Sequence, residues 1–221
     1  MSDILSSPLV ESICPAYKPC AHFAGVCSQM RWSPANGHVP RGFCGAIGNV
    51  REVELVLVSA EPGDPLPGAA HTDIESAITF AMNVLRNPPT RYHQNFRRIL
   101  EYCFPGQSFD EQLRRTWRTN SVLCSAEIEG GRVPRSIERT CTDTYLARQL
   151  ALLPHALVAA LGKKAQNRLR RQGIRFFPAA HPSSRKSDEA KHASWQALAK
   201  QLRIHRLNLR VNGTDVKIDR E

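Results

Sequence analysis

The sequence predicts an α/β protein of three layers, αβα, in which helices cover both faces of a central, mostly parallel sheet of four strands. After residue 50, short apolar runs alternate with longer segments whose apolar residues recur at helical spacing. Loops that contain glycine and proline separate these segments. Because parallel strands need a crossover between them, usually a helix, this alternation is typical of a parallel sheet with helices on both faces.

The strands are expected where short apolar runs are bounded by turn residues. These runs span residues 53–59, 117–123, 156–161 and 174–178. The helices are expected at residues 74–86, 91–103, 109–115, 137–153, 163–172 and 188–202. Asp73 and Ser136 precede two of these helices and can cap them, since a side-chain oxygen there accepts a hydrogen bond from a backbone N–H of the first turn.

The two ends of the chain depart from this alternation. Residues 1–50 hold several prolines and cysteines but few periodic apolar positions, so we expect an irregular segment that packs on the core and that a metal centre could order. Residues 51–205 are expected to form a single α/β domain. Residues 206–221 are expected to be a tail, in which apolar residues alternate before Asn212-Gly213, a pattern typical of a hairpin.

The composition is that of a globular protein, with 42% hydrophobic and 23% charged residues. No apolar run is long enough to cross a bilayer, and the N-terminus lacks the basic and then apolar pattern of a signal peptide. We therefore expect a soluble, cytoplasmic protein that has no membrane partner.

The charge balance is basic. Thirty Lys and Arg residues against 20 Asp and Glu residues leave a net charge of +10 and a pI near 9.6, which favours a polyanionic partner such as nucleic acid or a membrane surface. The basic residues cluster at Arg91, Arg97 and Arg98, at Arg114, Arg115 and Arg118, and at Lys163, Lys164, Arg168, Arg170 and Arg171. These clusters indicate either a surface that binds nucleic acid or a solvated surface that keeps the protein soluble.

The seven cysteines are many for a reducing compartment, where disulfides are rare. Cys124 follows an expected strand and Cys141 lies on the next expected helix, while Cys14, Cys20, Cys27 and Cys44 lie upstream. Four thiolates from two distant segments would hold an iron–sulfur cluster or zinc. No Cys-x-x-Cys pair is present, so spacing alone leaves buried thiols as an equal alternative.

Short polar motifs lie in or just after three of the expected strands. They are residues 60–64 (Ala-Glu-Pro-Gly-Asp), Thr119-Asn120, and residues 181–185 (His-Pro-Ser-Ser-Arg). Because ligands of open α/β sheets bind at the carboxyl ends of strands, these motifs could bring a carboxylate, an amide and an imidazole to one pocket. Taken singly, the first two are better explained by turn chemistry and by a locally bonded asparagine. The third favours a functional site, since its serines and backbone N–H groups can bind phosphate oxygens.

In this order along the chain, the motifs resemble those of the uracil-DNA glycosylase superfamily, over about residues 40–185. The resemblance is greatest to the iron–sulfur branch, known as family four, whose motifs read Gly-Glu-x-Pro-Gly, Thr-Asn-x-x-x-Cys, a helical Cys, Leu-Gly and His-Pro-Ser. The corresponding residues here are 59–63, Thr119-Asn120 with Cys124, Cys141, Leu161-Gly162 and residues 181–183. The resemblance implies a glycosylase-like αβα fold.

The first motif departs from that branch, which has Gly-Glu where this chain has Ser59-Ala60. Glu61 stands before the proline, where the first glycosylase family has a water-orienting aspartate, so the resemblance implies that Glu61 is catalytic, with Asp64 as the alternative. Gly63 stands where that family has a tyrosine that crowds C5 of uracil. The resemblance therefore implies weaker exclusion of other bases.

The resemblance assigns roles to further residues. Asn120 would bind the amide edge of uracil, His181 would stabilise the departing base, and Phe80 would stack on it. Ser183, Ser184 and Arg185 would bind DNA phosphates. Cys20, Cys27, Cys124 and Cys141 would hold a structural [4Fe–4S] cluster, with Cys14 as the alternative to one of the first pair and zinc, or no metal, as the alternative to the cluster.

The function that the resemblance implies is hydrolysis of the N-glycosidic bond of a flipped-out uracil in DNA, the first step of base-excision repair. The implied enzyme is a prokaryote-like monomer whose partner is uracil-containing DNA. Three alternatives stay open: a non-catalytic DNA-binding protein of the same fold, a glycosylase for other deaminated bases, and a regulatory protein that senses redox state through its cysteines.

Overall fold

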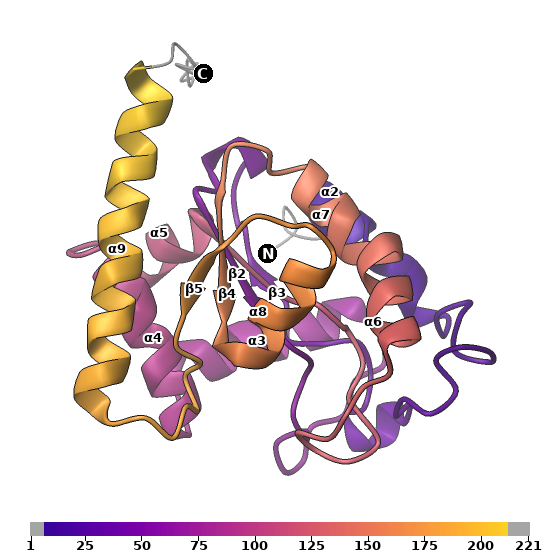
Figure 1. The fold of residues 1–221 in the computed structure, drawn as a ribbon. Helices are drawn as coiled ribbons and strands as arrows, with labels where there is room; N and C mark the ends of the chain where they lie inside the picture. The colour runs from indigo at the N-terminus through magenta and orange to yellow at the C-terminus, as the bar shows by residue number, and fades with distance from the viewer. Residues whose placement is uncertain (1–6, 212–221) are drawn as a thin grey trace.

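A five-stranded sheet lies at the centre of the molecule, of which the computed structural model describes residues 7–211 (Figure 1). The strands are β1 (Cys44–Gly45), β2 (Leu55–Ser59), β3 (Thr116–Asn120), β4 (Leu157–Leu161) and β5 (Phe177–Ala179), in the order β1-β3-β2-β4-β5. Strands β2 to β5 are parallel, which confirms the expected mostly parallel sheet. The sequence predicted four strands, and the fifth is β1, which pairs antiparallel with β3 and is too short to show a strand pattern.

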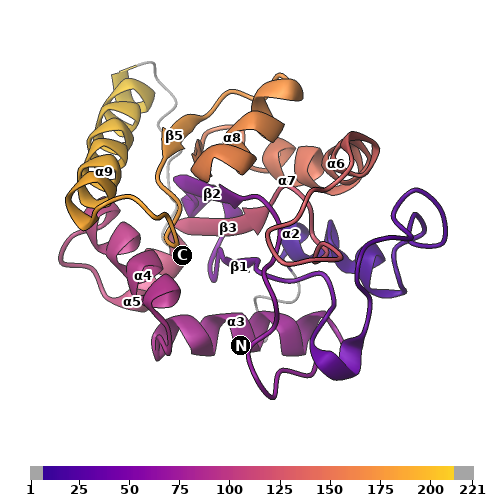
Figure 2. The ribbon, with the colours of Figure 1, turned by 60° about the horizontal axis from the view of Figure 1, so that its bottom comes forward.

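The helices form the two outer layers. They are α2 (Pro8–Glu11), α3 (Ile74–Arg86), α4 (Arg91–Cys103), α5 (Phe109–Arg114), α6 (Arg135–Cys141), α7 (Ala147–Ala151), α8 (Gly162–Arg171) and α9 (Asp188–Val211). Helices α6, α7 and α8 lie on one side of the sheet, and α3, α4 and α5 lie on the other (Figure 2). Helix α9 packs against α4 and β5. The arrangement is the expected three-layer αβα fold.

Local sequence explains where two of these helices begin. The Asp73 carboxylate accepts a hydrogen bond from the Ser76 N–H at 2.8 Å, which confirms the expected cap of α3. The expected cap at Ser136 is wrong, because α6 begins at Arg135 and has no side-chain capping bond. Pro134 fixes the backbone angle of the residue before α6 and so directs the chain into the helix without a cap. A π-helical turn (Thr142–Leu146) then joins α6 to α7.

The N-terminal segment contributes directly to the core. Between α2 and β2 it holds the two-residue strand β1 and short 3-10 helices at Cys14–Tyr17, Pro34–Asn36 and Val50–Glu52. Leu9, Ile13 and Phe43 are nevertheless almost fully buried in the same core as the sheet. Apolar burial, the main favourable term in folding, therefore contributes to ordering this segment.

The last helix is longer than the sequence predicted. Helix α9 continues past residue 202 to Val211, so the alternation at Leu207, Leu209 and Val211 belongs to a helix, and the strand expected there is wrong. No glycine or proline interrupts residues 188–211, and the helix has no reason to end earlier. The expected turn at Asn212-Gly213 lies outside the described residues. Among residues 7–211, no helix combines the length and the apolar character needed to cross a membrane.

The register of the sheet aligns the carboxyl ends of the parallel strands. Ser59 of β2 lies opposite Asn120 of β3, and Leu161 of β4 lies opposite Ala179 of β5. The three polar motifs predicted from the sequence therefore leave the sheet at the same edge.

Candidate active site

A cavity of about 320 Å³ lies at this edge of the sheet. Its wall is built by the loops that follow β2, β3 and β5, by α3 and the start of α4, and by residues 41–42 ahead of β1. The cavity includes these residues predicted from the sequence: Glu61, Gly63, Asp64, Phe80, Asn120, His181 and Ser183. Ser184 and the exposed Arg185 follow on the same loop but do not line the cavity. Side chains from three strand ends thus converge on one space.

Asn120 is held in a fixed orientation at the end of β3. Its side chain is buried, and its Nδ2 donates a hydrogen bond to the carbonyl oxygen of Arg41 at 2.8 Å. Gly42 makes this possible, because its φ is +84° and a Cβ at that position would lie 2.6 Å from Asn120 Nδ2. One N–H and the carbonyl oxygen of the amide can then serve a ligand as donor and acceptor.

His181 is positioned by contacts from both helical layers. The buried Asn95 of α4 donates to the carbonyl oxygen of Pro182 at 2.8 Å and so holds the loop that carries His181. On the other side, Gly162 begins α8 with a φ of +84°, and a Cβ there would lie 2.8 Å from the Cβ of His181. The Leu-Gly motif predicted from the sequence therefore has a structural reason, which is the close approach of His181.

The charge state of His181 follows from its surroundings. Burial, and then the positive charge of Arg118, lowers the pKa of His181 to about 4. Its Nδ1 accepts a hydrogen bond from the Ser183 N–H at 3.2 Å. In a neutral imidazole the proton then resides on Nε2. At neutral pH His181 is an uncharged hydrogen-bond donor beside the cavity.

The Glu61 carboxylate is engaged by cations. It is 6% exposed, and its Oε2 lies 2.6 Å from Nη2 of Arg168, while Lys164 contacts Oε1. Arg168 also pairs with Glu138 at 2.8 Å and is 1% exposed. The sequence placed Arg168 in a basic cluster on the surface or at nucleic acid, and for Arg168 that interpretation is wrong, because helix α8 directs this side chain into the core.

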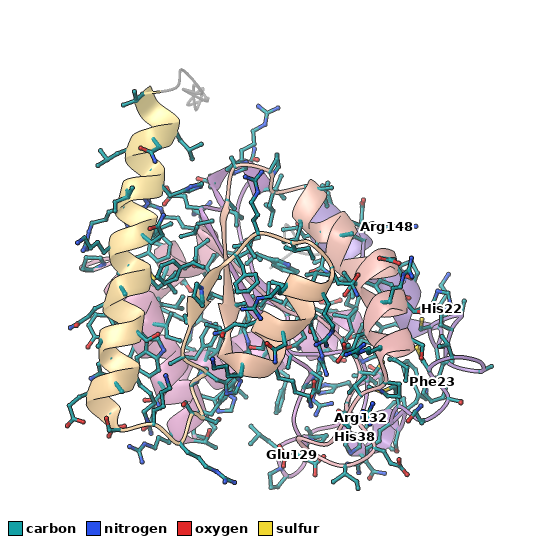
Figure 3. The ribbon with its side chains drawn as sticks, viewed as in Figure 1. His22, Phe23, His38, Glu129, Arg132 and Arg148 are labelled. Carbon is teal, nitrogen blue, oxygen red and sulfur yellow. The ribbon has the colours of Figure 1, made fainter. Side chains whose placement is uncertain are left out.

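The second predicted carboxylate, Asp64, lies at the rim. It is about half exposed and pairs with Arg31 at 2.7 Å. Its backbone N–H donates to Oε1 of Glu129 at 3.0 Å, and a Cβ on Gly63 would meet the same carboxylate. Glu129 therefore fills the space beside Gly63, in the loop region at the lower end of the molecule (Figure 3).

Sequence reasoning missed several residues of the cavity. Arg118 is 8% exposed, and its Nη2 donates to the Tyr92 hydroxyl at 2.6 Å. Tyr92 also lies beside His181, with ring centroids 5.6 Å apart. His71 and His93 complete this part of the wall. One signal could have found Arg118: strand side chains alternate, so Arg118 lies on the same face of β3 as Asn120.

Four cysteines surround a second, smaller cavity of about 20 Å³. They are Cys20, Cys27, Cys124 and Cys141, the set expected from the sequence, and Cys14 is not among them. Their thiols accept hydrogen bonds from the Tyr145 hydroxyl, to Cys20 at 3.0 Å, and from the Leu123 N–H, to Cys141 at 3.4 Å. His22 and Phe23 line the same cavity beside α6 (Figure 3).

The environment of these thiols disfavours thiolates that lack a cation. Burial and then the neighbouring Cys20 raise the pKa of Cys27 to about 11, and burial is the largest cause that raises the pKa of Cys141 to about 12. Across residues 7–211, no three His, Cys, Asp or Glu side chains are gathered closely enough to hold a single metal ion. The donor set itself, four soft sulfur ligands around one space, fits an iron–sulfur cluster.

Comparison with known protein families finds a match over most of the chain. A family described as the Uracil DNA glycosylase superfamily has a model that matches residues 47–202, most of the chain. The matched range includes Glu61, Asn120 and His181, and it excludes the N-terminal cysteines. Comparison with curated proteins gives no match.

Proposed function

The chain belongs to the uracil DNA glycosylase superfamily, and from this premise we propose that it hydrolyses the N-glycosidic bond of uracil flipped out of DNA. Membership supports a DNA glycosylase-type function, and the proposal adds the base. The observation that carries it is the convergence of Asn120, His181 and Glu61 on one cavity of about 320 Å³. Enzymes of this kind extrude the target base into such a pocket.

Asn120 would select the base. Uracil presents a carbonyl oxygen next to a ring N–H, and a fixed amide can donate to the first and accept from the second. Cytosine presents the opposite pattern and would leave the buried amide unpaired, which is strongly unfavourable. Phe80 and Tyr92 lie in the same wall and offer aromatic faces or edges to the ring.

His181 would act on the departing base. When the bond between the sugar and the base breaks, negative charge develops on the base and spreads to its carbonyl oxygens. The neutral imidazole, with its proton on Nε2, can donate a hydrogen bond to one of these oxygens. The role needs no proton transfer, since a donor aimed at developing charge lowers the barrier by itself.

Glu61 would act on the opposite side of the reaction. Positive charge develops on the sugar, and a buried carboxylate at the cavity stabilises it or positions the attacking water. Arg168 and Lys164 hold this carboxylate in place. Asp64, half exposed at the rim, stays the alternative.

The DNA backbone would be bound by the loop that carries His181. Ser183 lines the cavity, and Ser184 and Arg185 follow it towards the surface. Hydroxyl groups, backbone N–H groups and guanidinium are common phosphate ligands. The net charge of +10 would strengthen binding to DNA of any sequence.

Cys20, Cys27, Cys124 and Cys141 would hold a structural [4Fe–4S] cluster. When bound, it would supply a covalent crosslink between the N-terminal segment and the region around α6. Iron and sulfide analysis of the purified protein tests this, with Cys124→Ser expected to lose iron. Cys103→Ser is the control, because Cys103 is also a free cysteine in the structure but lies buried in α4, outside this set.

A second candidate function is excision of other deaminated bases. Gly63 has no side chain of its own to close the wall, and the end of the Glu129 side chain occupies the space instead. A bulky replacement of Gly63 would then narrow the range of bases.

The test is a base-excision panel with uracil, hypoxanthine, xanthine, thymine and cytosine in otherwise identical oligonucleotides. We expect release of uracil and no release of cytosine, and we expect Asn120→Ala and His181→Ala each to slow uracil release roughly 100-fold or more. Protein that binds the oligonucleotides but releases no base would show a non-catalytic DNA-binding protein instead.

A further inference from the structure

We propose that Arg118 is a catalytic residue of this chain, which contacts the departing base and stabilises its negative charge. The proposal rests on the glycosylase function above and assigns a cation to it. Arg118 lines the cavity with Asn120, from the same face of β3, and with His181, from the loop after β5. It thus faces the space in which the base would lie.

Arg118 is a buried cation without a carboxylate partner. It is 8% exposed, and no ion pair found within residues 7–211 includes it. The Tyr92 hydroxyl accepts from its Nη2, and the ring of Phe96 lies 4.8 Å from its guanidinium carbon. Its Nε is buried and has no hydrogen-bond partner among the described residues. Burying a charge in this way is costly unless something completes its surroundings.

The groups around Arg118 cannot provide the missing negative charge. Cys44 contacts it, but burial raises the pKa of Cys44, so the thiol stays neutral. The nearby imidazoles are neutral as well, because burial and then Arg118 itself lower the pKa of both His93 and His181 to about 4. A ligand that becomes an anion inside the cavity would supply the charge that the protein lacks.

Other unpartnered polar atoms lie in the same wall. The Oγ of Ser59 and the Nδ1 of His71 are buried without a hydrogen-bond partner in the described part of the chain, and both residues line the cavity. The second cation of the wall, Arg41, is already engaged, since its guanidinium donates to Ser125 and to the carbonyl oxygens of residues 37 and 63. Of these two cations, Arg118 is therefore the one that can still donate hydrogen bonds to a ligand.

The chemistry assigns Arg118 an electrostatic role. The bond between C1′ of the sugar and N1 of the base breaks, and its electron pair stays on the base. The oxygen of a water molecule forms a new bond to C1′, one proton of that water passes to solvent, and the released base takes a proton from solvent. Arg118 exchanges no proton, and its fixed charge stabilises the base while the electron pair arrives.

The test compares two leaving groups, uracil and 5-fluorouracil, in the same single-stranded oligonucleotide. Fluorine withdraws electrons and stabilises the departing anion, so 5-fluorouracil depends less on help from the protein. We expect Arg118→Gln to slow single-turnover release of uracil roughly 100-fold. We expect a loss about tenfold smaller for 5-fluorouracil, and a smaller loss of uracil release in Arg118→Lys, which keeps the charge.

Arg97→Gln is the matched control. Arg97 also lies over an aromatic ring, that of Phe109 at 4.0 Å, and it also lacks an ion-pair partner among residues 7–211, but it does not line the cavity. Arg97→Gln should leave the ratio of the rates of uracil and 5-fluorouracil release unchanged. The Lys variant carries the test if the Gln variant does not fold.

Two results would overturn the proposal, and they differ. If Arg118→Gln slows the release of both bases by the same factor, or slows the release of neither, Arg118 does not stabilise the leaving group. The glycosylase function would still stand. If the wild-type protein releases neither base, the proposed function itself fails.

Discussion

Two buried arginines, on opposite sides of the sheet, differ in the groups that surround their positive charge. Arg168, on α8, is 1% exposed and lies between the carboxylates of Glu61 and Glu138. Arg118, on β3, faces α4 and lies against the hydroxyl and rings of aromatic residues, and no carboxylate within residues 7–211 pairs with it. The difference separates two uses of a buried charge: a cation whose anions belong to the protein holds the fold, and a cation without one is suited to a charged ligand or transition state.

The largest effect on stability should come from the compensated arginine. Arg168→Gln would leave Glu61 and Glu138 buried with fewer cations, so we expect a loss of about 3 kcal/mol or more in the free energy of unfolding. Arg118→Gln removes a cation from aromatic faces but leaves no buried carboxylate unpaired. We therefore expect a loss of about 1 kcal/mol in the free energy of unfolding. Urea denaturation of both variants measures the two costs. Equal losses would show that the two arginines are not distinguished by their partners.

A second prediction tests the position of His181 separately from the charges around it. Gly162→Ala would force a Cβ to within 2.8 Å of His181, so His181 must move. A displacement of about 1 Å can cost roughly 100-fold in rate, so we expect a loss of uracil release of that order.

Gly173→Ala is the control for that substitution. Gly173 also has a positive φ, +69°, but no atom lies within 4 Å of the position of its Cβ. It should cost about 1 kcal/mol of stability from backbone strain and leave the excision rate unchanged. A Gly162→Ala variant as active as Gly173→Ala would mean that the position of His181 does not matter to the reaction.

A third prediction concerns the effect of pH on stability through His181, which lies near Arg118. His181 has a folded-state pKa of about 4, below the ordinary value of 6.5, so the unfolded chain binds a proton first as the pH falls. Stability should therefore be lost between about pH 6.5 and pH 4, by about 3 kcal/mol from this residue.

His181→Asn should flatten this part of the curve of unfolding free energy against pH, with the remaining slope due to groups such as His93. Arg118→Gln should raise the pKa of His181, followed by NMR of the imidazole, while burial still holds it below 6.5. A pKa that stays the same in this variant would remove Arg118 from the electrostatics of the site.

Much of this molecule was predictable because its signals are local. The bounds of α3 and α4 agree with the periodicity of residues 74–86 and 91–103. The polar motifs at the strand ends predicted the cavity residues Glu61, Asn120 and His181, since parallel strands bring their carboxyl ends together. The cysteine set was predicted by resemblance, because no spacing in the sequence distinguishes Cys20 from Cys14.

The remainder depends on tertiary packing. Arg118 and Arg168 look like surface residues in basic runs, and only the fold shows that one faces the cavity and the other lies between carboxylates. Strand β1 is two residues long, and its formation depends on the edge that β3 offers it. The alternation near Leu207 fits a strand or a helix equally, and continuity with α9 decides it.

In the proposed reaction, one extruded base occupies the cavity between Asn120, His181 and Arg118. A crystal structure of the wild-type protein with an oligonucleotide that contains 2′-fluoro-2′-deoxyuridine tests it directly, because the fluorine slows cleavage and preserves the bound base. We expect uracil in the cavity, with its amide edge on Asn120 and its carbonyl oxygens near His181 and Arg118. A base that stays stacked in the strand, or that binds elsewhere on the protein, would contradict it.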